Sequence, residues 1–209
     1  MRDPGRPAAP TDFDAAERGN WAGLAGDYRT SFALVCAGAV PYLADSAGIG
    51  PGSLVLDVGT GTGTAAAAAV GRGAVVTAVD ADAGMVAAAA ALVPEAACRV
   101  AALRALPFAD GQFEVALANF VVNHVGRPRA ALAELRRVTG PGGRVAVTAW
   151  PQPPSPAALL TRAVRDCGAD RPAHRVEASE DFPGPRMVFA VCLATPGLAI
   201  RPAGGSTGG

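Results

Sequence analysis

Lysine is absent from this chain of 209 residues, so its 18 basic side chains are all arginines. Without a lysine, the chain cannot form a Schiff base with pyridoxal phosphate or place a P-loop lysine on a nucleotide phosphate. An excess of either charge is also absent, because 18 acidic side chains balance the arginines. The basic surface that binds nucleic acid or an anionic membrane is therefore not expected, and small molecules or proteins are the expected partners.

Long apolar runs and metal-ligand spacings are absent as well. The longest apolar run, Met85 to Val93, has nine residues, whereas roughly 18 or more are needed to cross a bilayer. The amino terminus carries prolines where a secretory signal would carry an apolar stretch, so we expect a cytoplasmic protein. The four cysteines lie far apart and only two histidines accompany them, so no metal site is expected.

The length and composition fit one domain with a sizeable core, since half of the residues are hydrophobic and 17% are charged. We expect a disordered, proline-rich amino terminus at residues 1–12 and a disordered tail at residues 202–209. Between them, residues 13–201 should form a single domain. It would contain one or two leading helices in residues 13–50, a core in residues 51–150 and an atypical carboxyl-terminal part in residues 151–201.

Strand and helix patterns alternate through the core. They predict strands at 54–58, 74–79, 98–102, 113–119 and 144–150, and helices at 64–70, 82–93 and 128–138. Asp82 should cap the second of these helices, and the glycines of residues 140–143 should end the third and turn into the last strand. A further helix is expected at 156–167 and a strand at 187–194. Five strands separated by helices imply an α/β fold with a doubly wound, mostly parallel sheet and helices on both faces.

A glycine loop lies directly between the first strand and its helix, where residues 55–63 read Val-Leu-Asp-Val-Gly-Thr-Gly-Thr-Gly. Backbone there can approach a ligand closely, and N–H groups at the helix end can meet an anion. Asp80 ends the next strand, where a carboxylate can accept hydrogen bonds from the two hydroxyls of a ribose. A dinucleotide fold would have glycine or alanine at position 64, which is threonine, so NAD is disfavoured. Asp57 suits the amino group of S-adenosylmethionine, whose carboxylate the loop amides can bind.

These segments resemble the class I S-adenosylmethionine-dependent methyltransferases, in particular the small-molecule branch of the ubiquinone and menaquinone methyltransferases. The resemblance covers residues 12–150 and rests on five segments in the family's order, which are residues 55–63, 78–80, 105–114, 119–125 and 132–150. It implies a Rossmann-like sheet, S-adenosylmethionine as cofactor and a small-molecule methyl acceptor. The family's sheet has seven strands and ends in an antiparallel pair, for which this chain offers one candidate, residues 187–194. A shortened end would expose a sheet edge or an apolar surface and favour a homodimer.

The resemblance also implies a role for individual residues. The methionine part of the cofactor would lie over the loop, the ribose would bind Asp80, and the adenine would lie between Met85 and residues 102–103. The acid with which many relatives bind the adenine amino group is absent there. Asn119 and Phe120 would face the sulfonium and the substrate. The expected cofactor site consists of Tyr28, Asp57, Gly59, Thr60, Gly61, Gly63, Asp80, Ala81, Met85, Ala102, Leu103, Asn119 and Phe120.

Several of these residues have a second interpretation. His124, where relatives often carry paired histidines, is the candidate catalytic base, but a packing role is favoured because methyl transfer to a good nucleophile needs mainly proximity and alignment. Asn119 could instead bond the loop backbone. Met85 could belong to the core, and Tyr28 and Trp21 could either cover the cofactor or pack the leading helices. His174 is expected in a solvated loop.

We therefore predict an enzyme that moves the methyl group of S-adenosylmethionine to an oxygen, nitrogen or carbon atom of a small metabolite by in-line displacement. The protein would supply placement of the reactants and a pocket from which water is excluded. One alternative is a non-catalytic, methyltransferase-like binding or regulatory protein. A weaker alternative is a nicotinamide-dependent oxidoreductase.

Overall fold

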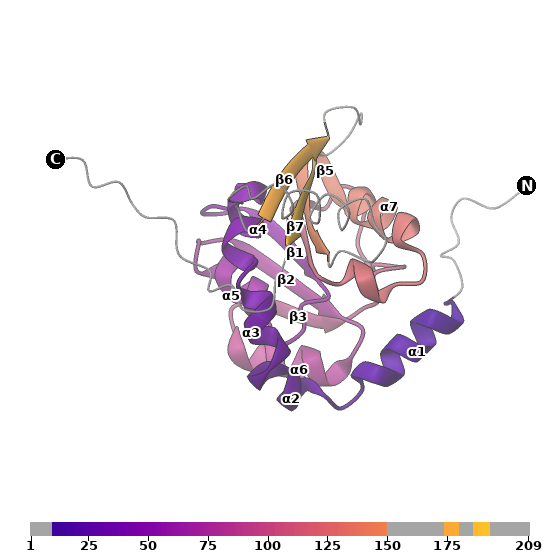
Figure 1. The fold of residues 1–209 in the computed structure, drawn as a ribbon. Coiled ribbons are helices and arrows are strands. Elements are labelled where there is room, and N and C mark those ends of the chain that lie inside the picture. Colours follow the sequence, from indigo (N-terminus) through magenta and orange to yellow (C-terminus); the bar gives the residue numbers. More distant parts are fainter. Residues whose placement is uncertain (1–9, 150–173, 180–185, 193–209) are drawn as a thin grey trace, which may run out of the picture.

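Four short helices precede the sheet in the computed structural model (Figure 1), which describes residues 10–149 and the strands at 174–179 and 186–192. They are α1 (Asp12–Trp21), α2 (Ala25–Thr30), α3 (Phe32–Ala37) and α4 (Val40–Ala47). The sequence predicted only one or two helices here, and that number is wrong. Apolar residues do recur at helical spacing, but Gly23 at φ +76° and Ser31 at ψ −93° interrupt the helical backbone.

The first helix is defined by a capping box. The Thr11 hydroxyl accepts a hydrogen bond from the Asp14 N–H at 3.1 Å, and the Asp14 carboxylate accepts one from the Thr11 N–H at 2.7 Å. Thr11, which belongs to the segment predicted to be disordered, thus caps a helix, whereas residues 1–9 lie outside the described residues. None of the ten residues described in α1 is fully buried, so this helix lies against the domain surface and adds no residue to the fully buried core.

Strands and helices then alternate nearly as the sequence predicted. The elements are β1 (Leu54–Val58), α5 (Thr64–Val70), β2 (Val75–Asp80), α6 (Ala83–Leu92), β3 (Ala97–Val100), β4 (Phe113–Asn119), the 3-10 helix η1 (Val122–His124), α7 (Pro128–Val138) and β5 (Thr139–Ala149). The predicted cap of α6 is confirmed, because the Asp82 Oδ1 accepts the Met85 N–H at 2.9 Å.

The start of β5 differs from the prediction. The glycines of residues 140–143 were expected to form a turn, yet the strand already begins at Thr139, which pairs with Phe113 before the register shifts. Glycine allows this because the neighbouring backbone comes very close: a Cβ atom at position 143 would lie 2.5 Å from the Glu114 carbonyl oxygen. The segment is thus an irregular strand start rather than a connecting turn.

Seven strands form one sheet in the order β3-β2-β1-β4-β5-β7-β6. The strand predicted at 187–194 is confirmed as β7 (Arg186–Cys192), which runs parallel to β5. β6 (His174–Ser179) pairs antiparallel with β7, which gives the antiparallel pair that the family resemblance implied. The prediction that His174 lies in a loop is wrong, because its backbone pairs with Cys192. The predicted helix at 156–167 and the tail at 202–209 lie outside the described residues.

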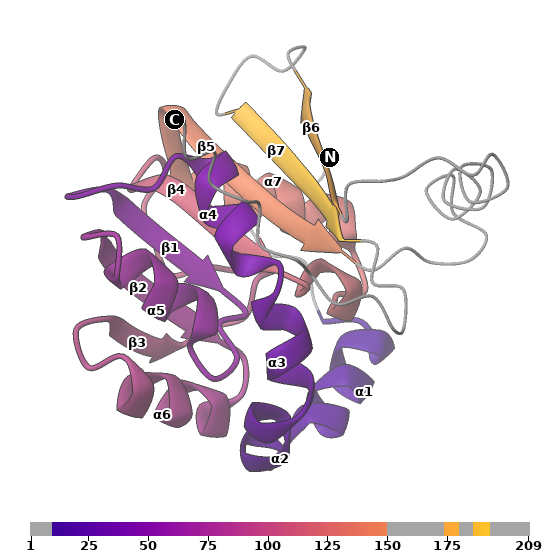
Figure 2. The ribbon, with the colours of Figure 1, turned by 60° about the vertical axis from the view of Figure 1, so that its left-hand side comes forward.

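Helices cover both faces of the sheet, which confirms the doubly wound α/β fold. Neighbouring residues of β1 point to opposite faces: Val55 packs in a cluster with α4 and α5, and Leu56 packs in a cluster with α7. Figure 2 shows α4, α5 and α6 in front of the sheet and α7 behind it. Burial of both faces explains the continuous apolar runs of the central strands.

The chain changes direction between β1 and β4, which lie side by side in the middle of the sheet. From β1 the chain moves outward to β2 and β3, then returns to β4 and moves outward on the other side. Sheets of this kind bind their ligands at the carboxyl ends of the strands beside such a switch point. No helix in the described parts of the chain is long and apolar enough to cross a membrane.

Candidate active site

A cavity of about 1040 Å³, including its open mouth, lies at the carboxyl ends of β1, β2 and β4. The ends of these three strands and the segments after them form one wall, with residues 58–59, 61, 80–82 and 119–121 contributing to it. Helices α1, α2 and α3 cover this end of the sheet, as Figure 2 shows. The cavity therefore lies where the fold predicts a ligand site.

The glycine loop approaches its neighbours too closely for side chains. Gly59, Gly61 and Gly63 have φ angles of +67°, +54° and +92°. A Cβ atom at Gly59 would lie 2.3 Å from a methyl carbon of Val121, and one at Gly63 would lie 3.1 Å from the backbone of Ala89. Glycine is thus required both by the left-handed backbone and by the close packing of the loop against the β4–α7 connection and α6.

Asp57 lies behind this loop and is fully buried. Its Oδ2 accepts a hydrogen bond from the Thr60 hydroxyl at 2.7 Å, whereas Oδ1 has no partner among the described residues. Burial raises the pKa of Asp57 to about 6, although the Thr60 hydrogen bond opposes the rise. Asp57, Thr60 and Gly63 do not belong to the cavity lining, so their contact with a cofactor stays a prediction.

Asp80 lines the cavity and faces it with a fixed carboxylate. Its Oδ2 accepts the Gly61 N–H at 2.9 Å, and its Oδ1 accepts the Asp82 N–H at 3.0 Å. Burial raises the pKa of Asp80, and the two hydrogen bonds oppose that rise. Because each carboxylate oxygen can accept about two hydrogen bonds, the group can still receive two hydroxyl donors. These features fit the two hydroxyls of a ribose.

The residues after β4 are tied to β5. The Asn119 Oδ1 accepts the Thr148 hydroxyl at 2.7 Å, and the Phe120 N–H donates to the same hydroxyl oxygen at 2.8 Å. Phe120 has a φ of +58° and is the only non-glycine residue with a positive φ in the described part of the chain. Such backbone persists where the surrounding structure enforces it, as it does in many ligand sites.

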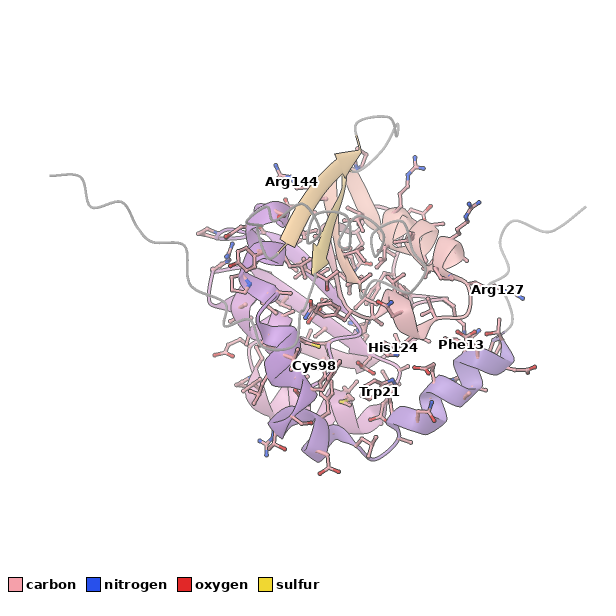
Figure 3. All side chains as sticks on the ribbon, in the orientation of Figure 1. Phe13, Trp21, Cys98, His124, Arg127 and Arg144 are labelled. Carbon is pink, nitrogen blue, oxygen red and sulfur yellow. The ribbon has the colours of Figure 1, made fainter. Side chains whose placement is uncertain are left out.

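An ionic and aromatic cluster closes the other side of the cavity. His124 Nδ1 lies 2.6 Å from Glu17 Oε2, and the Trp21 indole N–H donates to the same oxygen at 3.3 Å. The Trp21 and His124 rings pack edge to face, with centroids 5.2 Å apart. Nearby, the Asp14 Oδ1 accepts the Gly126 N–H at 2.8 Å. In Figure 3, Trp21 and His124 lie beside the carboxyl-terminal end of α1.

Tyr28 lies against the glycine loop, since a Cβ atom at Gly61 would meet its ring at 3.1 Å. Its ring packs edge to face on Trp21 at 5.6 Å. Burial raises the pKa of the Tyr28 hydroxyl above its usual value of 10.0. Tyr28 and Trp21 therefore both pack the leading helices and line the cavity, two interpretations that the sequence had left open.

The structure brings most of the predicted site together. The predicted residues that line the cavity are Tyr28, Gly59, Gly61, Asp80, Ala81, Met85, Ala102, Leu103, Asn119, Phe120 and His124. The sequence reasoning missed Asp14, Glu17, Arg18, Phe32, Cys36, Asp82, Arg104, Val121 and Val125, which also line it. One available signal was the spacing of Asp14, Glu17 and Trp21, which places all three side chains on one face of a helix.

Comparisons with known proteins agree with this geometry. Residues 56–147 match the protein family described as "Methyltransferase domain". A demethylmenaquinone methyltransferase of Renibacterium salmoninarum is 37% identical over 111 residues, which are 53% of this chain and 47% of the relative. An uncharacterised protein of Mycobacterium tuberculosis is 35% identical over 140 residues, 65% of this chain and 50% of the relative. The chain spans about half the length of the curated relatives that it matches.

Solved structures share the fold. A chain in the complex of the Haloferax volcanii Trm112 methyltransferase activator with a methyltransferase has a TM-score of 0.57 at 20% identity and covers 83% of this chain and 80% of its own length. A Methanococcus maripaludis protein, described as S-adenosyl-L-methionine-dependent methyltransferase, has a TM-score of 0.56 at 12% identity. The match covers 92% of this chain and 100% of that protein. The chain is therefore similar to the S-adenosylmethionine-dependent methyltransferases of class I, and in particular to the menaquinone methyltransferases.

Proposed function

We propose that this protein methylates a small-molecule acceptor that binds between the carboxyl edge of the sheet and α1. The single observation that carries the proposal is the Asp80 carboxylate, which two backbone N–H groups fix at the cavity beside the glycine loop. This arrangement suits a ribose next to an extended polar group.

In this proposal the cavity has a cofactor side and an acceptor side. Asp80 would accept hydrogen bonds from the ribose hydroxyls, the backbone of Gly59 and Gly61 would face the methionine part, and Met85 and Leu103 would hold the adenine. When bound, S-adenosylmethionine supplies an electrophilic methyl group. Charge-assisted hydrogen bonds to the carboxylate would each contribute about 1.5 to 3 kcal/mol to binding.

The acceptor side is largely aromatic and apolar. Trp21, Phe32, Phe120, Val121 and Val125 line it. Such walls exclude water and hold a ring in place, so that alignment provides much of the rate enhancement. The relatives named demethylmenaquinone methyltransferase make a quinol-like ring a reasonable acceptor to test first. The identity of the methylated atom, oxygen, nitrogen or carbon, belongs to the same proposal.

The two alternatives predict different binding and turnover. A non-catalytic relative would bind S-adenosylmethionine and transfer its methyl group to nothing. A nicotinamide-dependent oxidoreductase would bind NADH instead, although Thr64 occupies the position of the glycine or alanine that a dinucleotide fold requires. A single domain over residues 13–201, a cytoplasmic location and a homodimer remain predictions.

The experiment is a transfer assay with radiolabelled S-adenosylmethionine and a panel of acceptors that includes 1,4-dihydroxynaphthalene, substituted phenols, catechol and primary amines. We expect S-adenosylhomocysteine to form with at least one acceptor and the rate at limiting cofactor to fall at least 10-fold in Asp80→Ala. Asp45→Asn, which removes an exposed carboxylate paired with Arg72, is the matched control. Binding of the cofactor without transfer to any acceptor of the panel would favour the non-catalytic alternative.

A further inference from the structure

The contact between Glu17 and His124 joins two segments that are 107 residues apart in the sequence. The contact lies outside the apolar core, because none of the residues described in α1 is fully buried. The same Glu17 oxygen also accepts the Trp21 N–H, which holds the carboxylate in one orientation. Both side chains are mostly shielded, with 31% of His124 and 21% of Glu17 exposed. Glu17 and His124 therefore form a pair of fixed geometry in the cavity wall.

The contact determines which imidazole nitrogen carries the hydrogen. An ionised carboxylate can only accept hydrogen bonds, so Nδ1 of His124 must be the donor to Glu17. In the neutral ring Nε2 then holds the lone pair, and this nitrogen is the one that can accept a proton. The carboxylate also stabilises the imidazolium that forms when Nε2 takes up that proton.

The other titratable carboxyl groups of the described cavity lining are less suited to this step. Asp80 is bound by two backbone N–H groups, and Asp14 is bound by Thr11 and Gly126. Asp82 is occupied as the cap of α6. The pKa of the Tyr28 hydroxyl is raised, so this hydroxyl keeps its proton near neutral pH and does not serve as a base.

We propose that Glu17 is a positioning residue for His124, and that Nε2 of His124 accepts the hydroxyl proton of a phenol or hydroquinone. This inference rests on the proposed function and specifies its acceptor class. A neutral amine already carries a nucleophilic lone pair and needs no base before the transfer, whereas a phenol becomes a strong nucleophile when its proton leaves. The aromatic wall of Trp21, Phe32 and Phe120 suits the ring that such an acceptor carries.

The proton and electron balance is complete without a further reactant. The acceptor O–H bond breaks and its proton binds Nε2, while the phenolate electrons form a new bond to the methyl carbon of S-adenosylmethionine. The electron pair of the broken carbon–sulfur bond stays on sulfur, which gives S-adenosylhomocysteine. The bond forms at the oxygen, or at an adjacent ring carbon that then loses its own hydrogen. In the first case His124 releases the phenol proton to solvent. In the second case the ring hydrogen leaves as a proton and the oxygen takes its own proton back from Nε2. In either case methyl replaces one hydrogen, and one proton reaches solvent.

The first test needs no turnover. The chain has only two histidines, so His174→Asn leaves a single imidazole, whose ¹⁵N signals report where the hydrogen lies. We expect neutral His124 to carry its hydrogen on Nδ1, and Glu17→Ala to shift the ring towards the Nε2–H form that predominates in free histidine. An Nε2–H ring with Glu17 present, or no change in Glu17→Ala, would overturn the positioning role.

The second test varies the acidity of the acceptor. In Glu17→Ala and His124→Gln, we expect kcat for 4-methylphenol to fall by about 100-fold, the order found for general base catalysis. The loss should shrink to less than about 3-fold for 4-nitrophenol, which already forms phenolate at neutral pH, so proton removal no longer limits the rate. Asp45→Asn should match the unchanged protein with both acceptors.

The outcomes separate this inference from the function on which it rests. An equal loss of kcat with both phenols would show that the pair only shapes the cavity, and would overturn the base role. Cofactor binding and transfer to amines but to no phenol would overturn the acceptor class while leaving methyl transfer intact. Failure to bind S-adenosylmethionine at all would instead count against the proposed function.

Discussion

Replacing Asp57 by asparagine tests how the buried carboxyl group behind the glycine loop affects stability. The folded protein holds the pKa of Asp57 at about 6, compared with its ordinary value of 3.8. Between these two values the folded state binds more protons than the unfolded state. The free energy of unfolding therefore falls as pH rises through this window, and it is lowest where the buried group is fully ionised.

The magnitude follows from the size of the shift. The pKa rises by about two units, and each unit corresponds to about 1.4 kcal/mol, so ionisation of Asp57 costs the folded state about 2 to 3 kcal/mol between pH 4 and 7.5. Asparagine keeps an acceptor for the Thr60 hydroxyl but places an NH₂ group where Oδ1 has no partner among the described residues. That unsatisfied donor costs about 1 to 3 kcal/mol at every pH.

The cost of ionising Asp57 depends on pH, whereas the cost of the unsatisfied asparagine donor does not, so the pH dependence of the free energy of unfolding distinguishes the two. Denaturant unfolding at pH 4, 5, 6 and 7.5 gives the free energy of unfolding of both proteins. As pH rises over this range, the free energy of unfolding of Asp57→Asn should increase by about 2 to 3 kcal/mol relative to that of the unchanged protein. Thr60→Val removes the hydrogen bond that opposes the pKa rise and should extend the loss of stability to higher pH, but not in the Asp57→Asn background. Parallel pH curves for Asp57→Asn and the unchanged protein would refute the reasoning.

Three further predictions concern the loop, the segment before β4 and the ribose site. Gly59→Ala should lower stability by about 1 to 3 kcal/mol, because its Cβ would meet a methyl carbon of Val121 at 2.3 Å and the Val121 Cβ at 2.6 Å. The loss should be smaller in thermal melts of a Val121→Gly background, which lacks both atoms, and an equal loss there would contradict the steric cause. Arg137→Met should lower the free energy of unfolding by about 2 kcal/mol, since Arg137 donates to the carbonyls of Leu106 and Phe108; unchanged urea unfolding would contradict this. Burial raises the pKa of Asp80, so on acidification cofactor affinity should begin to fall at a pH above the usual pKa range of an aspartate. A cofactor affinity that stays constant down to pH 4 would contradict this.

The central sheet and the glycine loop could be predicted from the sequence because their signals are local. β1 and β4 are buried on both faces, so their apolar runs are continuous, and both strands were predicted with their observed bounds. Asp80 and the three loop glycines were placed by their position after strands, which the parallel topology brings to one edge of the sheet. Eleven of the predicted site residues accordingly line one cavity.

The remaining features depend on contacts between distant segments. Glu17 shares one helix face with Asp14 and Trp21, but this spacing does not reveal its partner His124, which is 107 residues away. Among the described residues α1 also has no buried apolar face that would show how it docks. β6 combines His174, Arg175 and Glu177 in a short edge strand, a pattern that resembles a polar loop until β7 pairs with it. The early start of β5 depends on backbone contacts that glycines allow but do not specify.

The most direct test of the central claim is isothermal titration of the protein with S-adenosylmethionine, S-adenosylhomocysteine and NADH, repeated with Asp80→Asn and the control Asp45→Asn. We expect micromolar binding of the first two ligands, none of NADH, and about a 10- to 100-fold weaker affinity in Asp80→Asn, which corresponds to the loss of one charge-assisted hydrogen bond. A folded protein that binds neither adenosyl ligand, or binds them equally well in Asp80→Asn, would contradict the proposed site.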